Sequence, residues 1–160
     1  MSSGGVRAFL IVCLAFVGGG FAALANAAPP EDACSLLTQA QVGAALGVPV
    51  NPGAYVTPTF KKTCTWNATT GGGGIVTLHL ESLDEFEGGK TMAAMVKSAS
   101  ATPVGGVGDE AYYFGAGTLT ALVVKKGPVA FKVALYAKNA ALETQRSVEK
   151  TLALQVVSHL

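Results

Sequence analysis

The chain begins with a continuous apolar segment. Residues 8–24 are all apolar or glycine, Arg7 is the one charged residue before them, and Ala25-Asn26-Ala27 follows. A charged start, an apolar centre and a small-x-small site are the three parts of a cleavable secretory signal. The apolar stretch of about 17 residues is also near the lower limit for a membrane span. We therefore predict a signal peptide over residues 1–27, cut after Ala27, and no stable membrane span after cleavage.

The remaining residues, 28–160, show the spacing of three amphipathic helices. Two of them open on capping boxes, Thr38-Gln39-Ala40-Gln41 and Ser82-Leu83-Asp84-Glu85. In the second helix we expect a break at Gly88-Gly89, because each glycine costs about 1 kcal/mol relative to alanine. The third helix is predicted from about residue 140 to 160. Its expected solvent side carries Glu143, Arg146 and Glu149.

Alternating apolar and polar positions predict strands between these helices. The strands are expected at 54–59, 64–67, 76–81, 110–114, 118–125 and 129–137. Short connections such as Lys126-Gly127-Pro128 favour hairpins and antiparallel pairing. The predicted order is αβββαβββα. The fold class is α+β, with a mostly antiparallel sheet and packed helices in a single domain over residues 28–160.

Two cysteines remain once the predicted signal peptide is removed. Cys13 lies inside the apolar stretch and not at a lipid-attachment position, which leaves Cys34 and Cys64. An even number of cysteines in an exported chain favours a disulfide, and the loop it closes would contribute about 3.5 kcal/mol. Because Cys64 and Trp66 alternate with polar residues, they share one side of their strand, so the disulfide would tie the first helix to the sheet near Trp66.

The charge pattern argues against several functional classes. Of 11 Lys and Arg residues only Arg7 is lost with the signal peptide, which leaves 10 against 10 Asp and Glu. A neutral chain with scattered basic residues does not have the features of a nucleic-acid binder. Gly88-Gly89-Lys90-Thr91 resembles the end of a phosphate-binding loop, but Asp84 stands where that motif needs glycine. The sequence predicts no cofactor, metal site or catalytic residue.

Four residues are the candidates for ligand contacts, and all are expected on strands. They are Trp66, His79, Tyr112 and Tyr113. Aromatic side chains on strands serve more often in a core than in a groove, so ligand binding is the less frequent of their two roles. An alternative is a hydrolase whose site combines His79 with Asp109. A further alternative is a secreted inhibitor that presents the glycine-rich loop at 70–74.

Three short motifs resemble those of a known family. They are Asp32-Ala33-Cys34-Ser35-Leu36-Leu37-Thr38, Cys64-Thr65-Trp66 and Gly106-Val107-Gly108-Asp109-Glu110-Ala111. Together they are similar to a group of small exported proteins and lipoproteins of unknown function that is common in actinobacteria. The resemblance implies paired cysteines and transfers no catalytic residue, and the lack of a lipid-attachment cysteine means that membrane anchoring does not carry over. We expect a non-catalytic binding or interaction module that acts in the cell envelope or outside the cell, on an envelope protein or a small apolar ligand.

Overall fold

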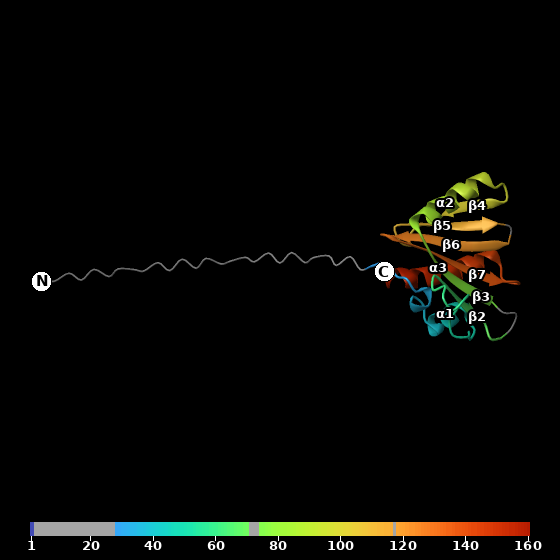
Figure 1. Ribbon diagram of the computed structural model, residues 1–160, viewed down its shortest axis with the longest axis horizontal. Coiled ribbons are helices and arrows are strands. Elements are labelled where there is room, and N and C mark those ends of the chain that lie inside the picture. Colours follow the sequence, from blue (N-terminus) through green and yellow to red (C-terminus); the bar gives the residue numbers. More distant parts are fainter. Residues whose placement is uncertain (2–27, 71–73, 117) are drawn as a thin grey trace.

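Seven strands form one antiparallel sheet in a computed structural model of the chain, in the order β1-β2-β3-β7-β6-β5-β4 (Figure 1). The structure describes Met1 and residues 28–70, 74–116 and 118–160, so the predicted signal peptide lies outside the described residues. The strands are β1 Ala54–Tyr55, β2 Thr63–Asn67, β3 Gly74–Glu81, β4 Ala99–Pro103, β5 Glu110–Ala116, β6 Leu119–Lys126 and β7 Val129–Ala137. The helices are η1 Ala33–Ser35, α1 Gln39–Leu46, α2 Leu83–Met95 and α3 Leu142–Val157.

The predicted α+β class, the antiparallel sheet and the disulfide are confirmed. Both predicted capping boxes are formed, with Thr38 and Ser82 as the N-caps of α1 and α2. The structure adds β4, which the sequence pattern did not indicate because its Ala-Ser-Ala-Thr-Pro sequence contains no large apolar residue. The first predicted strand is reduced to the two residues of β1, since Pro58 in the segment that follows cannot donate to a strand ladder.

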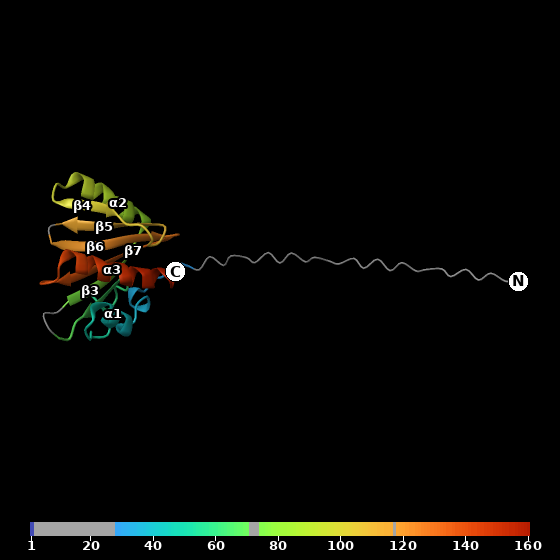
Figure 2. The same ribbon diagram turned by 180° about the vertical axis from the view of Figure 1, so that it is seen from behind.

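The helices cover the two faces of the sheet unequally. Helices α1 and α3 pack on one face and close the main core, whereas α2 lies on the other face over β4, β5, β6 and the start of β7 (Figures 1 and 2). On this face β2, β3 and most of β7 have no helix over them. We call this the open face of the sheet.

The disulfide lies in the main core. Cys64 and Trp66 share one side of β2, as the alternation of the strand predicted, and both are fully buried there because that side faces the helices. The bond from Cys34 joins η1 to β2, so it fixes the N-terminal segment of the domain to the sheet.

Helix α2 is continuous through Gly88-Gly89, and the predicted break is wrong. The two glycines have different surroundings. A β-carbon on Gly89 would overlap the hydroxyl of Tyr112, whereas one on Gly88 would meet nothing within 4 Å. Gly89 thus lets α2 approach the sheet closely, and this approach compensates for the helix propensity that glycine lacks.

Glu149 does not lie on the solvent side of α3, as the sequence suggested. It is fully buried between α3 and the sheet. Its Oε1 accepts a hydrogen bond from the backbone N–H of Leu135 (3.0 Å), and its Oε2 accepts one from the Thr120 hydroxyl (3.4 Å). The pairing of β6 with β7 stops at Ala121–Ala134, so the carboxylate binds a strand N–H just beyond the end of that ladder.

Candidate functional site

A row of four paired residues runs across the sheet from the open face to the strands under α2. In neighbouring strands, His79 of β3 pairs with Lys132 of β7, which pairs with Val123 of β6, which pairs with Tyr112 of β5. Directly paired residues in a sheet point to the same face, so these side chains are neighbours although they lie far apart in the sequence.

This row forms part of a groove between the open face and α2. The groove has a volume of about 460 Å³, which is within the range of small-molecule sites. Helix α2 contributes positions 85, 88, 89 and 92, whose spacing places them on one helical face. The complete lining is His79, Glu81, Glu85, Gly88, Gly89, Met92, Tyr112, Phe114, Val123 and Lys132.

His79 is held in place by two neighbours. Its Nδ1 lies 2.7 Å from the Thr63 hydroxyl, and its ring stacks on Phe60 with 6.2 Å between the ring centroids. Burial, and secondly the ammonium group of Lys132, lower the pKa of His79 below its usual value of 6.5. The imidazole is therefore neutral at pH 7. With Nδ1 engaged by Thr63, Nε2 is the ring nitrogen that a ligand can reach.

The charged groups of the groove leave it slightly acidic. Lys132 Nζ forms an ion pair with Glu81 Oε1 at 2.8 Å. Glu85 accepts a hydrogen bond from the backbone N–H of Ser82 (2.6 Å), and this bond lowers the pKa of the Glu85 carboxyl. One ammonium, two carboxylates and a neutral imidazole give a formal charge of −1, which favours uncharged or cationic ligand groups over anions.

Tyr112 supplies an apolar wall rather than a titrating group. Its hydroxyl donates to the backbone oxygen of Phe86 (2.8 Å), and the two rings meet edge to face with centroids 5.2 Å apart. Burial raises the pKa of Tyr112 to about 12, so the hydroxyl stays protonated. The ring of Tyr112 adjoins Val123 and Phe114 in the second, smaller apolar cluster under α2.

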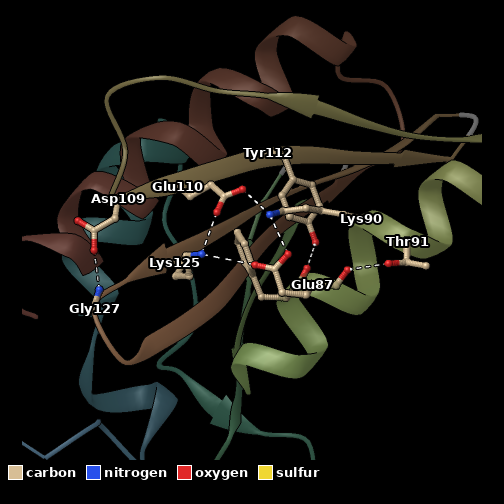
Figure 3. A network of polar contacts seen from close by, with 9 residues as sticks. Glu87, Lys90, Thr91, Asp109, Glu110, Tyr112, Lys125 and Gly127 are labelled. Carbon is tan, nitrogen blue, oxygen red and sulfur yellow. Dashed lines mark hydrogen bonds and ion pairs between the residues drawn. The ribbon is translucent and has the colours of Figure 1, made fainter.

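A network of charged side chains fixes α2 to the sheet next to the groove (Figure 3). Lys90 of α2 pairs with Glu110 of β5, and Lys125 of β6 pairs with both Glu110 (2.8 Å) and Glu87 of α2 (3.4 Å). Both ammonium groups also lie over the ring of Phe86, 4.6 and 5.1 Å from its centroid. Because the network holds equal numbers of acids and bases, it positions the helix without adding net charge.

Two of the four predicted ligand-contact residues meet in the groove. His79 and Tyr112 both line it, and binding by them stays a prediction. Trp66 is buried in the main core on the opposite face. Tyr113 also lies on that face, because it follows Tyr112 in the strand, and its hydroxyl donates to the backbone oxygen of Arg146 (2.7 Å). The structure does not bring Trp66 and Tyr113 to the groove.

Sequence reasoning missed most of the groove. Glu81 and Lys132 were not among the candidates, nor were the apolar residues Met92, Phe114 and Val123. Local periodicity places each of them on one face of its own strand or, for Met92, of helix α2. These residues become neighbours only through the order and register of the strands. No local sequence pattern carries that information.

The structure removes the His79–Asp109 pair as a hydrolase site. Asp109 immediately precedes β5, which lies three strands from β3, so the two backbones are about 14 Å apart across the sheet. The Asp109 carboxylate accepts hydrogen bonds from the backbone N–H of Gly127 (2.7 Å) and from Lys126 Nζ (2.9 Å). It therefore closes the β6–β7 turn. Most of the loop considered for an inhibitor, residues 71–73, lies outside the described residues.

Other features of the described residues point less clearly to a ligand. A hollow of about 570 Å³ beside α1 is lined by Gln39, Ala40, Gly43, Ala44, Gly47, Val48, Pro49 and Val50, none of which is ionisable. No group of three His, Cys, Asp or Glu side chains in the described ranges could hold a metal ion. Within the same ranges, no helix is both long and apolar enough to cross a membrane.

Comparisons with known proteins add no further information. No protein-family model, curated protein or solved structure matches the chain.

Proposed function

We propose that the protein is an exported, non-catalytic binding protein, and that the groove between α2 and the open face holds a small, largely apolar ligand. The observation that carries the proposal is the convergence of five elements on one groove with apolar walls and a few oriented polar groups. That combination is characteristic of small-molecule sites.

The chemistry of the groove indicates the kind of ligand. Met92, Phe114 and Val123 offer apolar contact, and His79 offers one oriented hydrogen-bonding nitrogen. The formal charge of −1 disfavours a carboxylate or phosphate on the ligand. The expected ligand is thus an uncharged or cationic molecule with an apolar body and one polar group beside His79.

The proposed site of action is the cell envelope or the exterior of the cell. The signal-peptide pattern of residues 1–27 and the disulfide between Cys34 and Cys64 both support export, since disulfides persist in oxidising compartments. Membership of the actinobacterial family of exported proteins and lipoproteins is part of the same proposal, and an envelope protein is the alternative partner. Mass spectrometry of the exported protein should find Ala28 as its first residue.

The binding proposal is tested with an uncharged apolar fluorophore, N-phenyl-1-naphthylamine, and two variants of one residue. Gly88 lines the groove and has open space around it, so Gly88→Phe should reduce the free volume of the groove without displacing α2. Its affinity for the fluorophore should fall by about tenfold, equivalent to about 1.4 kcal/mol. The matched control Gly88→Ala makes the same backbone change with one methyl group and should bind as the wild type does.

Two outcomes would contradict the proposal. One is a wild-type protein that does not bind the fluorophore at any concentration below its solubility limit. The other is equal binding by the wild type, Gly88→Ala and Gly88→Phe, which would place the fluorophore outside the groove. Chemical-shift changes at the amides of His79 and Val123 would locate the bound molecule independently.

A further inference from the structure

The C-terminus marks one end of the domain in Figure 1. On elements that meet at the opposite end, several large apolar side chains are exposed. They come from the start of β3, the end of β7, the start of β6 and the C-terminal part of α2 with the residue that follows it. We call this cluster the apolar end. Its members are Ile75, Met92, Met95, Val96, Leu119 and Tyr136.

The pairing of the strands brings these residues together. Ile75 pairs directly with Tyr136 on the open face, and Tyr136 and Leu119 line one hollow with Lys138. Val96 is linked to the same end because its backbone oxygen accepts the N–H of Ala99, the first residue of β4. All the members therefore lie at the same end of the sheet, spread from β3 to the β4 edge, although they come from distant parts of the chain.

Three of these side chains are mostly exposed and therefore bury little apolar surface in the fold. The side chain of Met95 is 79% exposed, and those of Leu119 and Tyr136 are 55% and 54% exposed. Apolar residues scattered singly over a surface are ordinary, but a group gathered at one end marks an interaction site.

The charges around the apolar end are mainly positive. Lys97 follows Val96 directly and Lys138 lies beside Tyr136, and both are exposed. Among the described residues, neither lysine forms an ion pair. The acidic residue at the start of α3, Glu143, is already paired with Arg146 (3.8 Å). The apolar end thus combines apolar side chains with two available cations.

We propose that the apolar end docks on the surface of an anionic lipid bilayer. Apolar side chains with an aromatic residue and flanking lysines are the composition of interfacial membrane contacts, in which the apolar groups enter the headgroup layer and the lysines bind acidic lipids. The charge complementarity selects an anionic surface. Met92 belongs both to the apolar end and to the wall of the groove, so a docked molecule would hold the groove next to the lipid.

The test is sedimentation of the exported protein, which starts at Ala28, with vesicles of phosphatidylcholine alone and of phosphatidylcholine with phosphatidylglycerol. Binding is expected to the anionic vesicles and to weaken with added salt. Each lysine near an anionic surface is worth about fivefold in affinity, so Lys97→Gln with Lys138→Gln should weaken binding by about 25-fold.

Met95→Glu combined with Leu119→Glu should abolish binding. The matched control is Val56→Glu, because Val56 is 63% exposed but lies beyond β1, away from the apolar end. All the altered side chains are exposed, so the circular dichroism spectra and melting temperatures should match those of the wild type. Gly88→Phe should bind vesicles normally, which separates failure of this proposal from failure of the groove proposal.

Several results would overturn the docking proposal. They are a wild type that binds neither vesicle, equal binding by the wild type and the double glutamate variant, or equal loss of binding in Val56→Glu. A concentration-dependent dimer in sedimentation velocity that disappears in the double glutamate variant would instead make the apolar end a contact between two copies of the chain.

Discussion

Glu149 is a carboxylate that the fold buries without a salt-bridge partner in the described residues. Burial raises its pKa from 4.5 to about 7, although the hydrogen bonds from Leu135 and Thr120 and the charge of Arg146 act in the opposite direction. Between these two pH values the native state binds one proton more than the unfolded chain. Its contribution to the free energy of unfolding is therefore present below pH 4.5 and decreases as the pH rises to about 7.

Replacing Glu149 should remove this pH dependence. The amide of Glu149→Gln can still accept the Leu135 N–H and can donate to the Thr120 hydroxyl, but it carries no charge. The variant should match the wild type near pH 4.5 and exceed its free energy of unfolding by about 3 kcal/mol at pH 8. Urea unfolding at the two pH values measures the difference. Glu143→Gln, which alters an exposed carboxylate of the same helix, should change neither value. A pH-independent difference would contradict the prediction.

His79 should titrate in the opposite sense. Since its pKa is lowered in the folded protein, the unfolded chain binds more protons just below pH 6.5, and the stability contributed by His79 is lost as the pH falls through that range. The Cε1 proton of His79 in an NMR titration should report a pKa below 6.5. Lys132→Gln removes the second cause of the shift and should bring the pKa part of the way back. A pKa at or above 6.5 in the wild type would refute this account.

At the residue scale, the sequence predicts which face of its strand a side chain occupies, but not which other residues it contacts. The alternation of β2 correctly placed Cys64 and Trp66 on one side of the strand, but which side faces the core becomes visible only in the fold. Glu149 was misplaced because a glutamate in a helical pattern is usually exposed. Its burial depends on a backbone N–H beyond the end of the β6–β7 ladder, which becomes visible only when the sheet is assembled.

At the scale of elements, α2 offers a direct comparison between two neighbouring glycines. Gly88→Ala should stabilise the protein by up to about 1 kcal/mol, because alanine is the better helix former and its methyl group meets open space. Gly89→Ala has the same gain in propensity but overlaps the Tyr112 hydroxyl, so it should lower the melting temperature. The melting temperatures of both variants, compared with that of the wild type, test the two expectations. Stabilisation by Gly89→Ala would show that α2 is less closely packed on β5.

The elements differ in how far local sequence determines them. The capping boxes at Thr38 and Ser82 are local, and both helix starts were predicted to the residue. By contrast, β4 is held by its pairing with β5 and by α2 above it, not by its own small residues. The continuity of α2 through Gly88-Gly89 has the same origin, since the close contact with Tyr112 outweighs a local preference.

For the whole molecule, the disulfide is the main covalent constraint among the described residues. It joins Cys34 and Cys64 across 30 positions of sequence and ties η1 to β2. Removing it with Cys34→Ala and Cys64→Ala should lower the free energy of unfolding by about 3.5 kcal/mol, because the unfolded chain regains the entropy of the open loop. Denaturant unfolding of the oxidised wild type and the double variant measures the loss. Equal stability of the two proteins would show that the loop is constrained by packing alone.

The fold class of the whole molecule and its disulfide could be predicted from the sequence, whereas the groove could not. Helix periodicity, strand alternation and an even cysteine count each depend on short stretches of chain, and they led to the α+β class and the disulfide. The groove depends on the order of the strands, which places β7 between β3 and β6 and so sets Lys132 between His79 and Val123.

The unequal covering of the sheet also has an evolutionary consequence. Residues on the covered face are constrained by the core, so nearly every change there reduces stability. Open-face positions such as Thr77 and Ala134 are only partly buried, and substitutions there leave the core intact. Natural variants of this chain should therefore accumulate changes on the open face first. Selection could in this way adjust what the surface recognises while the scaffold that supports it stays the same.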